Sequence, residues 1–395
     1  MSKWKKMTIG DLCDSISDTY RGDDKDVVLI NTSDVLEGKV LNHQVVENKN
    51  LKGQFKKTFK KNDILYSEIR PANKRYAFVD FGNTDNYIAS TKLMVLRPRK
   101  DVVRPRFLFS FLASKSVLEE LQQLAETRSG TFPQITFSSE LAPTPINVPD
   151  LETQDRIVGI LDVIEGKIST NAEINKNLEQ QAQAYFDELF VVNADPNWSE
   201  CTLSDIGSVV AGGTPSKSKP EYYADQGIAW ITPKDLSINK SKFISHGEND
   251  ISELGFSKSS AAKMPAGTIL FSSRAPIGYI AIAQNEVTTN QGFKSVIPNE
   301  NIGTAYLYFL LKNLLPTIEG IASGSTFKEI SGSAMKSVPT VMPDADTIQL
   351  FSSFCEPVFK EQEILEAENQ RLSALRNSLL PKLMSGELDV SDIDL

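Results

Sequence analysis

The side chains of this sequence that could do chemistry are concentrated in a few loops rich in turn-forming residues. The segment 70–76 combines two arginines, a lysine, an asparagine and a tyrosine with a proline. Arginine and lysine can bond to guanine edges, and asparagine and glutamine can bond to adenine edges. The segment 211–217 has two glycines, hydroxyl side chains and a lysine, which suit contact with a phosphate group. These residue types indicate recognition of DNA, although ordinary turn chemistry accounts equally well for any single residue.

The candidate DNA-contacting residues lie in both halves of the chain. In the first half they are Arg21, Arg70, Asn73, Lys74, Arg75, Lys92, Thr131 and Gln134. In the second half they are Gly213, Thr214, Ser216, Lys217, Lys234, Arg274, Asn290, Gln291, Thr326 and Lys328. A run of lysines between residues 49 and 61 is a further possibility, but a charge run is more often a solvated face than a binding site.

Residues suited to catalysis are scarce. The sequence has only two histidines, His43 and His246, and three widely spaced cysteines, Cys13, Cys201 and Cys355. This pattern gives little support to a histidine general base, a metal site or a disulfide framework, and it suits reduced thiols in the cytoplasm. The sequence also contains no phosphate-binding P-loop, no HExxH, no CxxC and no Asn/Asp-Pro-Pro-aromatic motif of amino-methylating enzymes. We therefore expect a chain with no catalytic residues and no metal or cofactor of its own.

The net charge of −9 argues at first against a DNA partner, but the charge is unevenly distributed. Residues 1–150 carry about 23 basic and 19 acidic side chains, and the segment 196–343 is balanced. The excess acid lies in the segments 151–195 and 344–395. Two blocks thus remain able to face phosphate. The sequence has no apolar run long enough to span a membrane and no signal peptide at its N-terminus.

The chain contains one internal repeat. The pattern Trp-x3-Thr-Ile-x-Asp-Leu at residue 4 recurs 194 residues later with Leu and Ile exchanged. Ile-Leu-Tyr-Ser at residue 64 recurs with Phe for Tyr at residue 269, and an arginine follows each copy. Ser-Gly-Thr-Phe-Pro-Gln-Ile at residue 129 recurs as Gly-Ser-Thr-Phe-Lys-Glu-Ile at residue 324. Because the order is kept while the spacing drifts, the sequence predicts a diverged tandem duplication.

Each copy begins with a mixed domain. Short β-branched and aromatic runs, such as 27–30, 63–66, 269–271 and 279–283, alternate with Gly, Pro and Asn turns. Apolar helical stretches are expected at 106–113 and 305–312.

Each copy ends with a helix of about 40 residues, beginning just after Pro149 or Pro343. Apolar residues recur along both helices with alternating spacings of four and three, which predicts a heptad seam. The residues expected to pair the helices or dock partner subunits are Ile164, Ile168, Asn175, Leu178, Tyr185, Leu365, Asn369, Leu372, Leu379 and Leu383. Asn175 and Asn369 occupy equivalent seam positions and could fix the helix register, although a solvated or partner-facing break explains them equally well.

The predicted fold class is α+β, with two domains of mixed sheet and helix joined by two long antiparallel coiled-coil helices with pseudo-two-fold symmetry. The expected recognition domains are residues 1–149 and 195–343. The expected helices are 150–194 and 344–386, and 387–395 is a C-terminal tail. At about 1.5 Å per residue, 40 helical residues would hold the two domains roughly 60 Å apart.

Several motifs then occur in a recognisable order. They are Gly-Gly-Thr-Pro-Ser at residue 212, Trp-Ile-Thr-x2-Asp-Leu at 230, Ser-Ser-Arg-Ala-Pro-Ile-Gly at 272, Thr-Asn-Gln-Gly-Phe at 289 and Leu-x2-Leu-Arg-x2-Leu-Leu-Pro-Lys-Leu-Met-Ser-Gly-Glu-Leu at 372. Together they resemble the specificity (S) subunits of type I restriction–modification systems over the whole chain. The first copy departs from this pattern, because Asp-Thr-Tyr-Arg-Gly at residue 18 stands near the place of the Gly-Gly-Thr-Pro-Ser loop.

The resemblance implies a non-catalytic subunit that reads a bipartite, asymmetric site on double-stranded DNA with two target-recognition domains. It also implies two methyltransferase (M) subunits and restriction/translocase (R) subunits as partners, with S-adenosylmethionine, ATP and Mg²⁺ belonging to those partners. A coiled-coil scaffold that binds only proteins and a stand-alone DNA enzyme are the alternatives.

Overall fold

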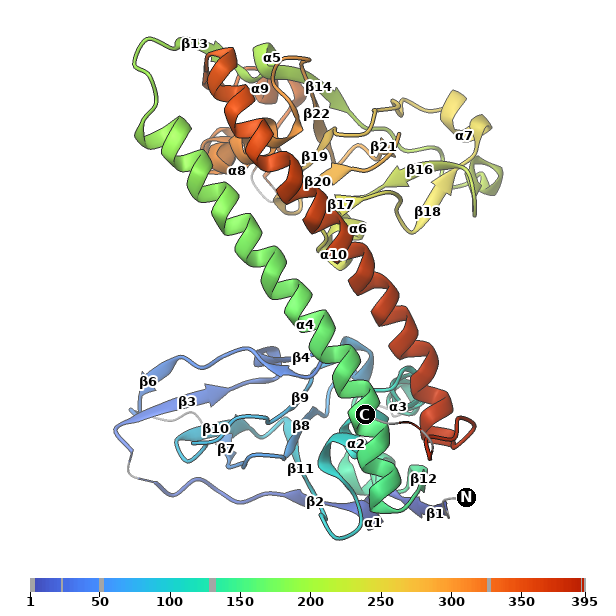
Figure 1. Cartoon of the computed structure of the whole chain (residues 1–395). Coiled ribbons are helices and arrows are strands. Elements are labelled where there is room, and N and C mark those ends of the chain that lie inside the picture. The colour runs from blue at the N-terminus through green and yellow to red at the C-terminus, as the bar shows by residue number, and fades with distance from the viewer. Residues whose placement is uncertain are drawn as a thin grey trace. The chain divides into compact units, whose positions relative to one another are not determined.

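The computed structural model describes residues 4–22, 24–49, 53–127, 133–324, 328–391 and 393. The chain divides into unit 1, which comprises Met1–Ile168 and Arg371–Leu395, and unit 2, which comprises Ser169–Gln370. The long helices α4 (Leu151–Asp187) and α10 (Ala345–Ser385) each contribute one segment to each unit (Figure 1). In the described part of the chain, no helix is both long and apolar enough to cross a membrane.

Unit 1 contains two four-stranded sheets. One is antiparallel throughout, in the order β2 (Cys13–Ile16), β11 (Leu93–Pro98), β8 (Ile64–Ser67), β9 (Tyr76–Phe78). The other is mixed, in the order β6 (Val45–Glu47), β3 (Asp26–Ile30), β10 (Tyr87–Ser90), β7 (Phe55–Lys57). The remaining elements are the hairpin β4 (Val35–Leu36) and β5 (Lys39–Val40), the helices α2 (Pro105–Leu112) and α3 (Lys115–Thr127), and short helical turns at Thr32–Asp34, Pro71–Asn73 and Phe137–Leu141.

Unit 2 repeats this plan. Its larger sheet has the order β14 (Gly207–Ala211), β22 (Lys294–Pro298), β19 (Ile269–Ser273), β20 (Ile277–Ala283), β17 (Phe243–Ile244). The smaller sheet has the order β15 (Tyr223–Ala224), β18 (Asn249–Ile251), β16 (Ile228–Ile231), β21 (Thr288–Thr289). The remaining elements are α6 (Pro233–Ile238), α7 (Glu253–Ser257), α8 (Thr304–Ile321), α9 (Gly332–Lys336) and short helical turns at Glu188–Val192 and Pro220–Tyr222.

A two-stranded ribbon closes each copy and confirms the duplication. β1 (Lys5–Thr8) pairs with β12 (Pro145–Val148), and β13 (Ser199–Thr202) pairs with β23 (Pro339–Met342). Lys5 faces Val148 and Ser199 faces Met342, so both strands of the ribbon are shifted by 194 residues (199 − 5 and 342 − 148). The short helices α1 (Ile9–Leu12) and α5 (Leu203–Ile206) follow the ribbons, and each begins with a Thr/Asp capping box.

The apolar core of each unit joins the sheet to a helix and to the two long-helix segments. In unit 1, Phe107 of α2 belongs to the same buried cluster as Leu161 of α4 and Leu383 of α10. In unit 2, Phe309 of α8 lies against Phe351 of α10, with ring centroids 5.7 Å apart. The predicted helical stretches at 106–113 and 305–312 are confirmed as α2 and α8, and α8 continues nine residues further.

The helix seam runs antiparallel within unit 2. Asn171 Nδ2 donates to Asn369 Oδ1 at 3.0 Å, and Gln362 Nε2 donates to the Asn175 carbonyl at 3.1 Å. Position numbers therefore rise on α4 as they fall on α10. Asn175 and Asn369, which occupy equivalent seam positions, therefore have different partners, because an antiparallel pair brings opposite ends of the repeat together. The side-chain contact of Asn369 favours a register-fixing role for that residue over a solvated break in the seam, whereas the bond from Gln362 reaches only the backbone carbonyl of Asn175.

Candidate nucleic-acid interface

The candidate loops of unit 2 leave the larger sheet at one end. Ala211, the last residue of β14, faces Lys294, the first residue of β22, and Ser272 near the end of β19 faces Phe293. Antiparallel neighbours place the end of one strand beside the beginning of the next. The loops that follow β14 and β19 and the loop that precedes β22 are thus gathered together, as the sequence motifs require.

Two glycines allow the first of these loops to pack closely on another. The Gly213 amide donates to the Thr289 carbonyl at 2.8 Å, and the Trp230 indole donates to the Gly213 carbonyl at 3.0 Å. A Cβ added to Gly212 would lie 2.0 Å from the Asn290 carbonyl oxygen, so no other residue fits there. Beyond the glycines, the Thr214 hydroxyl donates to the Gln291 side-chain oxygen.

The other candidates of unit 2 surround the same loops. The Asn290 amide donates to the Ile231 carbonyl at 3.0 Å, which brings the beginning of α6 and exposed Lys234 to this end of the domain. Lys234 forms an exposed ion pair of 2.6 Å with Glu248. Ser216 and Lys217 are exposed in the turn that follows Thr214.

Glu329 lies at this end of the sheet, next to Arg274. Arg274 forms an isolated antiparallel bridge with Glu329, and the Arg274 guanidinium lies 3.4 Å from the Glu329 carboxylate. Lys294 Nζ, on a largely buried side chain, lies 3.8 Å from the same carboxylate. Exposed Lys328 precedes Glu329. Glu329 was not among the predicted site residues, although its place in the repeated Gly-Ser-Thr-Phe-Lys-Glu-Ile motif could have indicated it.

In unit 1 the corresponding end of the sheet is formed by β8 and β11, which are the equivalents of β19 and β22. Ser67, the last residue of β8, faces Leu93, the first residue of β11. The Glu68 amide then donates to the Lys92 carbonyl at 3.0 Å, and the Arg70 amide donates to the Pro133 carbonyl at 3.0 Å. Arg70, Lys92 and Gln134 are therefore brought together, with Lys92 Nζ 3.4 Å from the Glu68 carboxylate.

The other predicted residues of unit 1 have more varied surroundings. Arg75 donates to the backbone carbonyls of Ser33 at 3.0 Å and Val35 at 3.4 Å, so part of its guanidinium is used inside the fold. Lys74 pairs with Glu37 at 2.7 Å, and Asn73 and Arg21 are exposed.

Two predicted residues cannot be placed in this way. Thr131 and Thr326 lie outside the described residues. In the part of the chain that the structure describes, no group of His, Cys, Asp or Glu side chains is arranged to hold a metal ion.

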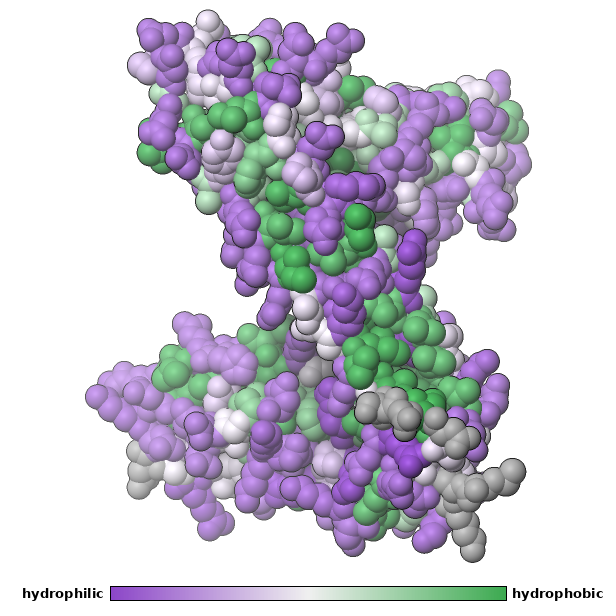
Figure 2. Space-filling view, in the orientation of Figure 1, coloured by the Kyte–Doolittle hydropathy of each residue, from purple (hydrophilic) through white to green (hydrophobic). Residues whose placement is uncertain are grey.

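The predicted helix-pair residues are mostly covered. Ile164, Leu365 and Leu383 are buried, and the remaining seam residues are half-buried: Ile168, Asn175, Leu178, Tyr185, Asn369, Leu372 and Leu379. Large apolar side chains remain exposed on the outer faces of the helices in both units. They are Val163 and Leu375 in unit 1 and Ile174, Leu350, Phe354 and Ile364 in unit 2. Figure 2 shows hydrophobic areas on the visible face of each unit, among a mainly hydrophilic surface.

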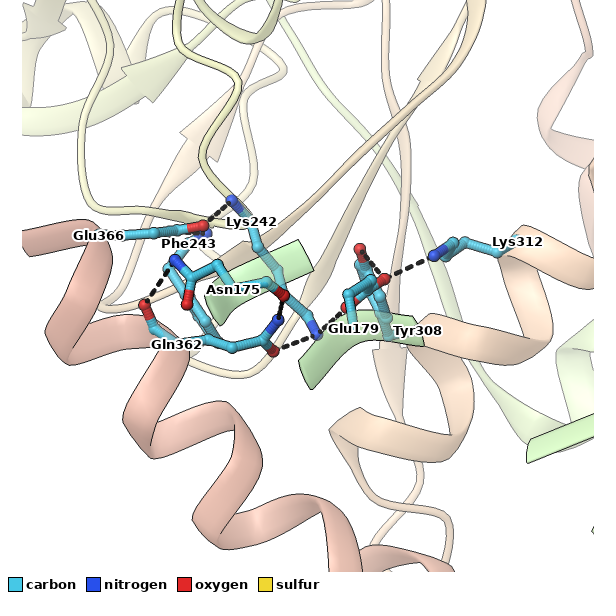
Figure 3. Close-up of polar contacts among 8 residues, drawn as sticks. All are labelled: Asn175, Glu179, Lys242, Phe243, Tyr308, Lys312, Gln362 and Glu366. Atoms are coloured by element: carbon cyan, nitrogen blue, oxygen red, sulfur yellow. Dashed lines mark hydrogen bonds and ion pairs between the residues drawn. The ribbon is translucent and has the colours of Figure 1, made fainter. Parts of the chain in front are cut away.

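A buried lysine fastens the recognition part of unit 2 to both helix segments (Figure 3). Lys242, which is 8% exposed, places Nζ 2.8 Å from the Glu179 carboxylate of α4 and 2.9 Å from the Gln362 side-chain oxygen of α10. The same ammonium group lies 3.5 Å from the centre of the Phe359 ring. The lysine amide donates to the Glu366 carboxylate at 2.8 Å. One residue thus contacts three helical side chains and a ring.

The carboxylate of Glu179 is the centre of this cluster. It also accepts from Lys312 Nζ at 2.5 Å and from the Tyr308 hydroxyl at 3.2 Å, both on α8. Burial lowers the pKa of Lys242 to about 8, because desolvation outweighs the attraction of Glu179. Burial alone would raise the pKa of Glu179, but the two lysines lower it below its ordinary value. The sequence offered no sign of this cluster, since its members lie far apart along the chain.

The sequence and the fold of the chain have counterparts in known proteins. The family model described as "Type I restriction modification DNA specificity domain" matches residues 1–180 and 196–374. The specificity subunit of the type I restriction enzyme HindI from Haemophilus influenzae is 33% identical, over 98% of this chain and 100% of that protein. The MjaIX specificity subunit from Methanocaldococcus jannaschii is 40% identical over 46% of this chain and 44% of that protein.

A solved structure shares the fold. The S subunit of a type I restriction–modification system from M. genitalium has a TM-score of 0.57 at 19% identity, over 97% of this chain and 96% of that chain. The family model covers both repeats, and the relative from H. influenzae is matched over its full length. The chain belongs to the family of type I restriction–modification DNA specificity proteins.

Proposed function

We propose that this chain is the DNA-binding specificity subunit of a type I restriction–modification complex and that each unit reads one half of a bipartite, asymmetric site on double-stranded DNA. The observation that carries the proposal is the duplication, in a chain of this family, of a loop cluster at the same end of the same sheet. Two similar but unequal readers suit two unequal half-sites. A scaffold that binds only proteins would have no need of either cluster.

The chemistry of the two clusters suits DNA. Exposed Lys217, Lys234 and Lys328 in unit 2 can neutralise phosphates, and the Gly-Gly-Thr-Pro-Ser loop adds hydroxyl and amide donors. Arg274 and Gln291 in unit 2, and Arg70 and Gln134 in unit 1, are of types that bond to base edges. Backbone hydrogen bonds to neighbouring strands and loops hold the loops that carry these four residues in place. Sequence-specific recognition requires hydrogen-bond donors at fixed positions. The anchoring of these loops therefore favours base recognition over general electrostatic attraction.

The same proposal assigns catalysis to partner subunits. The two acidic helices, with exposed apolar side chains such as Val163 and Ile364, have the composition of protein-docking surfaces. We assign them to two M subunits, with R subunits joining the assembly. S-adenosylmethionine, ATP and Mg²⁺ would then belong to those partners, and the complex would work in the cytoplasm, where cysteines such as Cys13 and Cys355 stay reduced.

The proposal is tested by co-expressing the chain with its M subunit and sequencing the DNA of the producing cell for modified adenine. We expect a split motif with a constant gap, modified on both strands only when the chain is present. Modification that ignores the chain, in a complex that assembles, would contradict the proposal and favour the scaffold alternative. The isolated chain with DNA and S-adenosylmethionine is the control for the enzyme alternative, and we expect no methyl transfer.

A further inference from the structure

The end of the sheet that carries the candidate loops has the same backbone in both units. In unit 1 the Ile135 amide donates to the Glu68 carbonyl at 2.8 Å, and in unit 2 the Ile330 amide donates to the Ser273 carbonyl at 3.1 Å. Each of these hydrogen bonds lies beside an isolated antiparallel bridge, Ile69 with Gln134 and Arg274 with Glu329. Ile69 and Arg274 are therefore structurally equivalent, and so are Gln134 and Glu329.

A second backbone hydrogen bond establishes the same correspondence independently. The Glu68 amide donates to the Lys92 carbonyl at 3.0 Å, and the Ser273 amide donates to the Gly292 carbonyl at 2.7 Å. Strand pairing agrees, because Ser67 faces Leu93 in unit 1 and Ser272 faces Phe293 in unit 2. A one-residue slip in either unit would break both hydrogen bonds.

The side chains on this common backbone differ in kind. Unit 1 pairs apolar, half-buried Ile69 with the exposed, uncharged amide of Gln134. Unit 2 pairs the guanidinium of Arg274 with the carboxylate of Glu329. Both unit 2 side chains keep more than a third of their surface exposed, at 38% and 39%, so each remains available to a ligand. An identical backbone with unlike side chains is what two readers of different bases require.

The two pairs have opposite preferences for base pairs. An arginine held by a carboxylate can present its remaining N–H groups to the O6 and N7 acceptors of guanine, and a glutamate can accept from the cytosine amino group. A glutamine can bond to N6 and N7 of adenine, and an aliphatic side chain can contact the thymine methyl group. The carboxylate of Glu329 is also within 3.8 Å of Lys294, which limits the positions that Glu329 can adopt.

We propose that the positions of Ile69 and Gln134 in unit 1, and of Arg274 and Glu329 in unit 2, determine base specificity, with unit 1 reading an A·T pair and unit 2 a G·C pair there. The inference rests on the proposed function and names the residues that distinguish the two half-sites. Glu329 holds the arginine in place and accepts from cytosine. Gln134 takes the equivalent place for adenine.

The experiment exchanges the two residues in the intact complex. Glu329→Gln and Gln134→Glu are made separately, each is co-expressed with the M subunit, and the modified motif is read from cellular DNA. We expect each variant to change one base pair in one half-site, with at least a ten-fold loss of modification at the original base pair, on the order of what one bidentate contact contributes. The two variants should affect different half-sites and leave the gap unchanged.

Controls distinguish a failure of this inference from a failure of the proposed function. Lys328→Gln removes a neighbouring exposed charge, and it should lower modification uniformly without changing the motif. If both exchange variants modify the original motif at its original level, the inference is overturned and the proposed function stands. If the wild type produces no modified motif that depends on the chain, the proposed function itself is overturned. If Glu329→Gln does not assemble, Arg274→Gln tests the pair from its other member. It must alter the same base pair, and an unaltered motif would again overturn the inference.

Discussion

At the scale of single residues, unit 2 depends on a polar cluster that sequence patterns do not reveal. Lys242 is almost fully buried, and its charge is balanced mainly by Glu179, which also binds Lys312. Removing one member of a buried pair leaves the other uncompensated, which is costly. Burial lowers the pKa of Lys242, so the fold disfavours the charged form of this lysine. The two lysines lower the pKa of Glu179, so the fold favours the charged form of this carboxylate.

We therefore expect Glu179→Gln to destabilise unit 2 by about 3 kcal/mol, because it leaves the Lys242 charge buried without a counter-ion. Lys242→Met should cost less, because Glu179 keeps Lys312 and Tyr308 as partners. Lys312→Met, which removes the more exposed cation, is the matched control. Hydrogen exchange of the α8 amides in the full chain measures each loss. An equal loss for Glu179→Gln and the control would show that the cluster does not act as described.

The pH dependence of the stability of unit 2 tests the same cluster in a second way. Since the folded pKa of Glu179 is lowered, its contribution to stability is present above its unfolded value near 4.5 and is lost as the pH falls below that. The difference between wild type and Glu179→Gln should then shrink in acid. Lys242 behaves differently, because between pH 8 and about 10.5 the unfolded state holds its proton longer, so stability from this group rises with pH. Lys242→Met should abolish that rise.

At the scale of elements, α4 and α10 are paired through defined side chains. Asn171 binds Asn369 and Asn175 binds Gln362, so the helices are matched at fixed positions within unit 2. The family and the proposed bipartite site suggest that helix length sets the gap between the half-sites. The expectation that the two recognition domains are held roughly 60 Å apart with two-fold symmetry stays a prediction.

An insertion of four residues in α4, about one helical turn, should lengthen the gap in the modified motif and leave both half-sites unchanged. Sequencing of modified DNA from cells that make the altered complex measures the gap. The same four residues inserted at Gly82, where the surroundings are open, are the control and should change nothing. An unaltered gap with the α4 insertion, in an active complex, would mean that the helix is not the ruler.

At the scale of the whole molecule, two recognition domains in one chain predict independent readout. Replacing residues 195–343 with the corresponding segment of the H. influenzae relative should change one half-site only. Lys242, Tyr308 and Lys312 lie in the exchanged segment while their partner Glu179 stays on α4, so a chimera that carries these three residues should assemble better than one in which they are replaced. A change in both half-sites, read from modified DNA, would show that the domains do not read independently.

The sequence was sufficient for the plan of the molecule. Motifs repeated in the same order predicted the duplicated domains, and the register of β1 with β12 and of β13 with β23 reproduces the shift of 194 residues seen for the first motif. Heptad spacing predicted both long helices, because an amphipathic helix records its buried face in its own sequence. The loops 211–217 and 289–292 were identified by residue type, and the structure brings them together.

Only the tertiary structure decided which residues meet. Glu329 was overlooked because its role depends on Arg274, 55 positions away, and Lys242 because its partners lie on two distant helices. The asparagine partners could not be predicted from equivalence, since antiparallel pairing joins positions that the repeat does not match. Local periodicity and turn chemistry are encoded in neighbouring residues. Buried ion pairs and strand-end contacts join residues that are distant along the chain, so no local pattern shows which residues will pair, even where one of them stands in a repeated motif.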